Sequence, residues 1–182
     1  MAGFRSITPS ISINTESGQL RTELLNTFSR LDGQLSQAPY RIATQNGPVG
    51  NTGTGETLLM QFTLNQGTLT QIGASILIFA CGTTNANANN KTLSLYIGNT
   101  AIFTTGAVAL NNKDWTFQGE IVFNGGSSQI TWGQFQSNGT APIIETNTST
   151  ESLAVNKNIT FTGIGGATDD ISLYYYKATL IN

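Results

Sequence analysis

From Glu56 almost to the last residue, the chain consists of short segments in which apolar and polar residues alternate. Clusters of Gly, Asn, Thr and Ser separate these segments, and no helical periodicity interrupts them. Alternation with a period of two is typical of strands that bury one face. Eight or nine short strands without intervening helices predict a mainly β protein, an antiparallel β-sandwich of the jelly-roll-like kind. We expect the strands at 56–64, 74–81, 92–97, 101–104, 115–123, 129–136, 142–145, 159–162 and 171–180.

One short amphipathic helix is predicted ahead of this β-region. Five large apolar residues recur at spacings of four, four, three and four, which places them on a single helix face. Ser17 is a plausible N-cap, and the helix ends at Gly33 or, at the latest, before Pro39. An isolated helix of this length is marginal in water, so its stripe must be buried against something. The predicted oligomer or anchor interface is formed by Leu20, Leu24, Phe28, Leu31 and Leu35.

Three partners could bury this stripe: the β-domain of the same chain, sister subunits around a symmetry axis, or another protein. The stripe spans about two heptads, which is fewer than a coiled coil needs. Residues 1–38 are therefore expected to be an extended arm and helix used for anchoring or oligomerisation. Residues 39–55 have the composition of a Gly-rich linker, and residues 56–182 form the β-sandwich domain.

The composition excludes several classes of function. The chain has no His, which removes His-based acid–base catalysis and most zinc sites. Its 8 basic residues are scattered, so neither nucleic-acid binding nor a basic membrane-surface helix is expected. Only 10% of residues are charged, and the surface must be coated mainly by uncharged polar side chains. The one Cys, Cys81, follows an apolar run and is expected to pack in the core.

The acidic residues show no catalytic context. A glycosidase needs two carboxylates that flank the scissile bond, and no pair of acids stands out here. Asp169 and Asp170 could supply oxygens to Ca²⁺, although two acids of a solvated loop are the simpler interpretation. We therefore expect a protein that is not an enzyme and uses no metal or cofactor. The acids considered are Glu56, Asp114, Glu120, Glu145, Asp169 and Asp170.

Several aromatic residues are candidates for contact with a ligand or another subunit. Trp132, Tyr96 and Tyr175 lie in alternating segments, where an outward ring could stack on a sugar or pack in an interface. In the run 174–176 at least one ring must point outward while its neighbours point inward. Trp115 begins a strand and is expected to anchor the core.

Two neighbouring runs resemble a known module. Residues 82–98 contain Ala86-Asn87-Ala88-Asn89-Asn90-Lys91 followed by Leu93, Leu95 and Gly98, and residues 103–115 end in Leu110-Asn111-Asn112-Lys113-Asp114-Trp115. This pattern resembles a β-sandwich module of structural proteins of tailed bacteriophages, over roughly residues 56–180.

The resemblance implies a virion component, and such proteins are commonly trimers. It leaves open a capsid decoration (cement) protein, a short head fibre or a tail fibre. The leading hypothesis is a decoration or head-fibre protein that binds the major capsid protein or other virion proteins. The alternative is a receptor-binding tail fibre that recognises host surface glycans. Because the first residues lack the apolar run of a signal peptide, we expect synthesis in the host cytoplasm and a final place on the particle surface.

Overall fold

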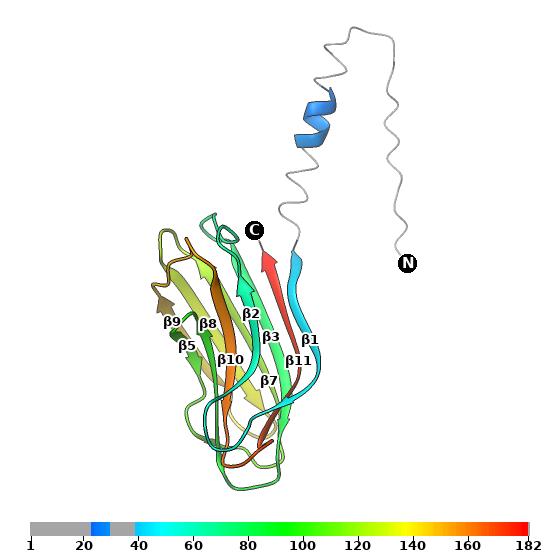
Figure 1. Ribbon diagram of the computed structural model, residues 1–182, viewed down its shortest axis with the longest axis vertical. Coiled ribbons are helices and arrows are strands. Elements are labelled where there is room, and N and C mark those ends of the chain that lie inside the picture. Colours follow the sequence, from blue (N-terminus) through cyan, green and yellow to red (C-terminus); the bar gives the residue numbers. More distant parts are fainter. Residues whose placement is uncertain (1–22, 30–38, 182) are drawn as a thin grey trace, which may run out of the picture. The chain divides into compact units, whose positions relative to one another are not determined.

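The computed structural model describes residues 23–29 and 39–181, and it confirms the mainly β class. Residues 23–29 form a helix, and eleven strands follow (Figure 1). The strands are β1 (Tyr40–Gly50), β2 (Thr57–Leu64), β3 (Ser75–Thr84), β4 (Asn90–Ile97), β5 (Thr100–Thr104), β6 (Val108–Ala109), β7 (Asp114–Phe123), β8 (Gln129–Ser137), β9 (Ile143–Ser149), β10 (Lys157–Ile164) and β11 (Ile171–Ile181).

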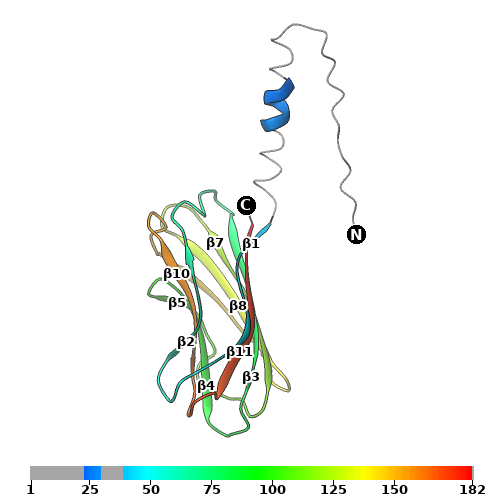
Figure 2. The ribbon, with the colours of Figure 1, turned by 45° about the vertical axis from the view of Figure 1, so that its right-hand side comes forward.

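The strands form two antiparallel sheets that pack face to face as a sandwich (Figure 2). One sheet has six strands in the order β1-β11-β3-β7-β8-β9, and the other has the order β2-β10-β4-β5, with β6 paired to β4. The first strand pairs with the last, and β2 pairs with β10, so the two ends of the domain run side by side in each sheet. This winding is that of a jelly roll, with the β8–β9 hairpin extending the six-stranded sheet.

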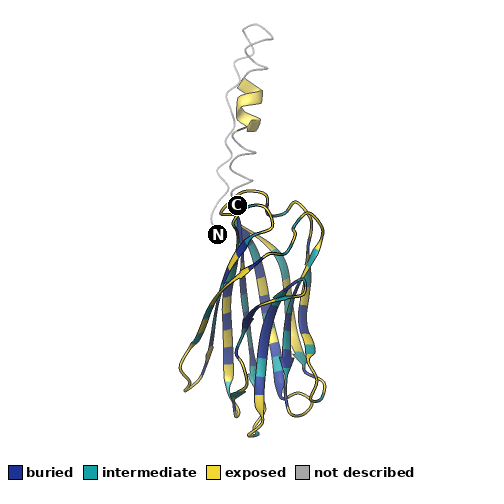
Figure 3. Cartoon of the chain, turned by 90° about the vertical axis from the view of Figure 1, so that its left-hand side faces the viewer, coloured by how far each residue is buried: buried dark blue, intermediate teal, exposed yellow. Residues whose placement is uncertain are grey.

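Aromatic rings from both sheets meet in the core between them. Phe117 on β7 lies 4.9 Å from Phe103 on β5 and 5.3 Å from Phe161 on β10, measured between ring centroids. Trp115 is also buried, and its indole N–H donates to the carbonyl oxygen of Thr83 at 3.2 Å. Trp115 is therefore the core anchor that the sequence predicts. Buried and exposed residues alternate along the strands, as Figure 3 shows.

The Gly-rich linker predicted for residues 39–55 is wrong over most of its length. Residues 40–50 form β1, an edge strand paired along its length with β11. Two of the residues that suggested a linker, Gly47 and Pro48, fall at a register shift between Asn46 and Val49, where Gly47 has a φ of +118°. Gly53 and Gly55 follow the strand. An edge strand tolerates Gly and Pro at a bulge because one side of its backbone needs no partner.

The strand β3, which contains the apolar run that ends at Cys81, is buried on only one of its faces. Ile76, Ile78 and Ala80 point into the core. The intervening residues lie on the outer face of the six-stranded sheet, where Leu77 is exposed and Cys81 is half-buried. The prediction that Cys81 is a core residue is therefore wrong. Burial still raises the pKa of its thiol.

The chain divides into two units, Met1–Ala38 and Pro39–Asn182, and the second contains the sandwich. In the first unit, the helix at 23–29 carries Leu24 and Phe28 of the predicted stripe, and both side chains are exposed. Leu20, Leu31 and Leu35 lie outside the described residues, so the stripe as a whole stays a prediction. No described helix is long and apolar enough to cross a membrane.

Candidate functional site

The outer face of the six-stranded sheet carries most of the features that could form a binding site. Residues paired across antiparallel strands place their side chains on the same face, so the register defines rows that cross the sheet. The first row is Arg41, Thr179, Leu77, Glu120 and Trp132. The second row is Thr44, Lys177, Phe79, Gln118 and Gln134. The third row is Asn46, Tyr175, Cys81, Thr116 and Gln136.

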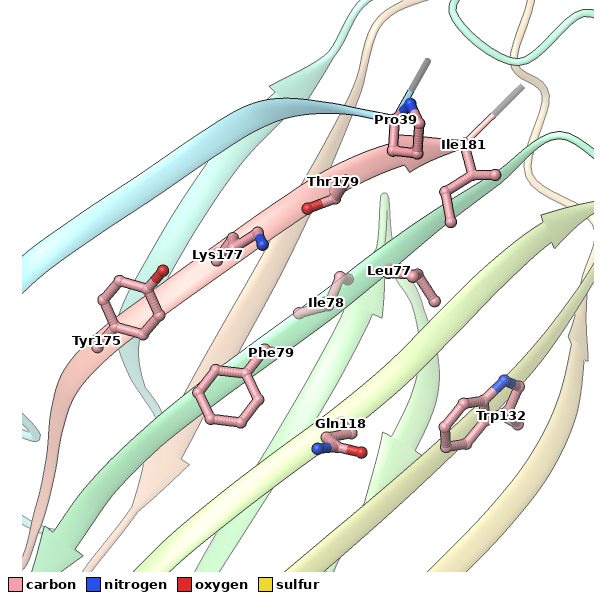
Figure 4. A pocket seen from close by; sticks show the side chains of 10 residues that line it. All are labelled: Pro39, Leu77, Ile78, Phe79, Gln118, Trp132, Tyr175, Lys177, Thr179 and Ile181. Atoms are coloured by element: carbon pink, nitrogen blue, oxygen red, sulfur yellow. The ribbon is translucent and has the colours of Figure 1, made fainter. Parts of the chain in front are cut away.

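A groove of about 600 Å³ follows these rows. This volume is within the range of small-molecule sites, which are mostly apolar with a few polar groups. The groove matches that description because its polar side chains are Gln118, Lys177 and Thr179. The residues that line it are Pro39, Leu77, Ile78, Phe79, Gln118, Trp132, Tyr175, Lys177, Thr179 and Ile181 (Figure 4).

Aromatic rings lie at both ends of the groove. At one end, the indole N–H of Trp132 donates to Oε2 of Glu120 at 3.0 Å, which holds the ring against β7. At the other end, Phe79 and Tyr175 form a tilted pair with ring centroids 6.1 Å apart. Trp132 and Tyr175 are three strands and two rows apart, which separates their Cα atoms by roughly 20 Å. The site is thus an elongated groove with an aromatic platform at each end.

The charges on these rows are unevenly placed. Arg41 and Lys177 are the two cations, and they lie diagonally on the adjacent strands β1 and β11. Glu120 is the one acid on the rows, and its carboxylate already accepts the hydrogen bond from Trp132. Over residues 23–29 and 39–181 the single ion pair joins Lys157 to Glu151, so Lys177 has no acidic partner in the described part. The β11 side of the groove is therefore positively charged.

The structure brings together two of the three aromatic residues that the sequence singled out. Trp132 and Tyr175 line the same groove, whereas Tyr96 lies on β4 in the other sheet. The Tyr96 hydroxyl donates to Oε1 of Glu56 at 2.8 Å, and burial, followed by this contact, raises its pKa. Tyr96 is therefore not part of the groove.

The prediction for residues 174–176 is only partly correct, because Tyr174 points outward and Tyr176 inward, but Tyr175, next to Tyr174, also lies on the outer face. Tyr174 is exposed, and Tyr176 is buried with its hydroxyl donating to the carbonyl oxygen of Gln61 at 3.4 Å. A register shift between Leu173 and Tyr175 lets Tyr175 turn toward the groove beside Phe79. Sequence reasoning missed Phe79, Gln118 and Lys177 as groove residues. The alternation of Leu77 and Phe79 with Ile76 and Ile78 could have indicated two different faces.

Outside the groove, a polar cluster joins the loop after β3 to the loop before β11. The carboxylate of Asp170 accepts hydrogen bonds from the amide groups of Asn87 and Asn89, and from the backbone N–H groups of Gly166 and Ala167. Burial alone would raise the pKa of Asp170, but these four hydrogen bonds outweigh it and lower the pKa.

The fully buried Lys91 completes this polar cluster. Its ammonium donates to Oδ1 of Asn87 at 2.7 Å, and to the carbonyl oxygens of Asn87 and Asn89 at 3.2 and 3.0 Å. Asn87, Asn89 and Lys91 belong to the run that resembles the phage module, and here their role is structural.

Asp170 is neither a solvated loop acid nor free to bind calcium. Only 1% of its surface is exposed, and its carboxylate is already fully used by the cluster. Within the described residues, no group of three or more His, Cys, Asp or Glu side chains could hold a metal ion.

Asp169 is exposed, and three of the other acids have structural partners. Glu56 accepts from Tyr96, Glu145 accepts from the backbone N–H of Thr104, and Asp114 accepts from Asn138. Glu120 lies beside the groove, next to Trp132. Asp114, on the same strand, is six residues away from it, or roughly 20 Å along an extended chain. Paired carboxylates in glycosidases lie much closer, about 5–9.5 Å apart. None of the described residues that line the groove is an acid.

Comparisons with known proteins give little further information. No protein-family model matches the chain, and no curated protein sequence matches it. Among solved structures, the marine PL-14 alginate lyase from Aplysia kurodai matches with a TM-score of 0.38 and 11% identity, over 67% of this chain and 82% of the lyase chain. At this level of similarity, the match supports no statement about activity or ligand.

Proposed function

We propose that this chain is a non-enzymatic structural protein of a bacteriophage particle. In this proposal it is a capsid decoration or head-fibre protein that forms a homotrimer and binds the capsid surface through its N-terminal region. The observation that carries the proposal is the apolar surface of the helix at 23–29. Leu24, Leu25 and Phe28 are 41%, 57% and 63% exposed there.

An exposed cluster of this kind favours association. Leu24 and Phe28 lie one helical turn apart, and Leu25 widens their face because it is three residues before Phe28. Full burial of a Leu or Phe side chain stabilises an assembly by about 1.5–3 kcal/mol. Three such side chains on each subunit, repeated around a symmetry axis, would supply a substantial part of the energy of a trimer.

The sandwich supports a structural role in a different way. Its core is completed by its own two sheets, and the Asp170 cluster ties two of its loops together. The surface carries few charges and many uncharged polar groups, as the low charged fraction of the chain requires. Together with the resemblance of residues 82–115 to the phage module, these features favour a rigid body that projects from a particle.

The test is the solution mass of the full chain and of a variant with both Leu24→Glu and Phe28→Glu. The native chain is expected at three times its 19.3 kDa mass, and the double variant as a monomer. The matched control is Asn26→Glu, which adds a charge on the opposite side of the same helix. A monomeric native chain, or a trimer that persists in the double variant, would contradict the proposal. Electron cryo-microscopy of intact particles would show where on the particle the protein lies.

A second candidate function is glycan recognition by a receptor-binding tail fibre. The observation that favours it is that Trp132 and Tyr175 line one groove. This function does not require the helix, so the two candidates can be tested separately.

A further inference from the structure

We propose that the groove on the six-stranded sheet binds an extended glycan that carries anionic groups. The proposal rests on the second candidate function, glycan recognition, and assigns it a site and a ligand class. It does not depend on the trimer.

The aromatic residues suit a sugar because each ring has hydrogen-bonding groups beside it. A pyranose ring presents an apolar C–H face surrounded by hydroxyl groups, so a binding site needs a flat apolar surface next to donors and acceptors. Trp132 is flanked by Glu120 and by Gln134 of the adjacent row, while Phe79 lies between Gln118 and Lys177 on its own row. The fully buried core of a protein–protein interface is instead depleted of charged residues. The alternation of ring and polar group in this groove therefore favours a glycan.

The length of the groove favours a chain over a single sugar. The platform formed by Phe79 and Tyr175 and the platform formed by Trp132 are at opposite ends, as Figure 4 shows. With Cα atoms roughly 20 Å apart, one monosaccharide cannot contact both Trp132 and Tyr175. Gln118 lies between the platforms and can bond to hydroxyl groups along the chain.

The charge of the groove favours an anionic glycan. Lys177 lines the groove, and Arg41 lies diagonally beside it on β1. The one acid on the three rows, Glu120, is two strands from Lys177 and already bonded to Trp132. A carboxylate, sulfate or phosphate on the glycan would therefore meet two cations without an acidic competitor beside them. Charge-assisted hydrogen bonds of this kind are about twice as strong as neutral ones.

The experiment measures binding of the full chain to a matched set of neutral and acidic oligosaccharides, including uronate oligomers and sialylated chains. We expect binding to acidic members that weakens as salt is raised. Trp132→Ala and Tyr175→Ala should each abolish most of this binding. Lys177→Met should weaken the affinity for acidic ligands by roughly tenfold or more.

Two controls separate a role in binding from a role in folding. Tyr96→Ala removes an aromatic ring from the other sheet, and Lys113→Met removes a cation outside the groove. Both should bind like the native chain. Melting curves followed by circular dichroism must show that each groove variant is folded.

Three binding results would overturn the proposal. They are no binding by the native chain, equal binding of neutral and acidic members, and unchanged acidic binding in folded Lys177→Met. A change of solution mass in Trp132→Ala would likewise overturn it, by indicating that the groove packs against a second copy of the chain. None of these results would alter the mass difference expected for the helix variants, so failure of this proposal and failure of the assembly proposal are distinguishable.

Discussion

Replacing Asp170 with alanine should destabilise the sandwich by about 3–5 kcal/mol, the usual effect of leaving a buried charge without its compensating partner. Lys91 has no exposed surface, and its ammonium bonds only to neutral oxygens of Asn87 and Asn89. The negative charge that balances it is Asp170, bonded to the amide groups of the same two Asn residues. The substitution also frees the N–H groups of Gly166 and Ala167.

The assay is equilibrium unfolding in urea at pH 7, where a shift of the midpoint with an unchanged slope reports a change in stability. A double-mutant cycle with Lys91→Met tests the mechanism. If the two residues act as one unit, the double variant should be more stable than the sum of the single effects predicts, by about 1–3 kcal/mol. Additive effects, or a loss below about 1 kcal/mol for Asp170→Ala, would refute the reasoning.

The pH dependence gives an independent check. Because the pKa of Asp170 is lowered in the folded protein, its contribution is fully present above the unfolded-state pKa of about 3.9. The contribution is lost as the pH falls through the lower folded-state pKa. The difference in stability between the native chain and Asp170→Ala should therefore shrink in acid.

Two further predictions concern the sandwich. Gly82→Ala should destabilise the sandwich by at least about 1–3 kcal/mol in urea unfolding, because the new Cβ would lie 1.8 Å from the Ser172 carbonyl oxygen and 2.6 Å from the Trp115 ring. The control Gly55→Ala places its Cβ in open space and should be nearly neutral. Equal effects of the two substitutions would contradict this account. Lys157→Met should cost at most about 1 kcal/mol, since the ion pair with Glu151 is partly exposed. The hydrogen bond from Lys157 is the main cause that lowers the pKa of Glu151 in the folded protein, so the loss of stability should vanish as the pH falls through that pKa. A loss that stays constant down to pH 2 would rule out the ion pair as its cause.

Most of the strands could be predicted from the sequence because alternation reports burial directly. The segment around Trp115 and the segment containing Trp132 are examples, and β7 and β8 lie where the pattern places them. The edge strand β1 was missed because its Gly and Pro residues have turn propensity, and only its pairing with β11 makes it a strand. The local propensity of a segment decides its secondary structure where no neighbouring strand pairs with it, and strand pairing decides it elsewhere.

The candidate site depended far more on the fold. Trp132 and Tyr175 could be proposed from the sequence as outward rings, but so could Tyr96, and alternation cannot say which sheet a strand joins. Asp170 shows the same limit, because its partners Asn87 and Asn89 are more than 80 residues away in the sequence.

By itself, the sequence determined the sandwich, and it predicts the apolar helix stripe that precedes it, since periodicity depends only on residues close together in the chain. The tertiary structure decided which aromatic rings share a groove, which cations lie beside them, and why Asn87, Asn89 and Lys91 are present. These features depend on the register between strands far apart in the sequence, and in a jelly roll that register is set by the packing of the two sheets.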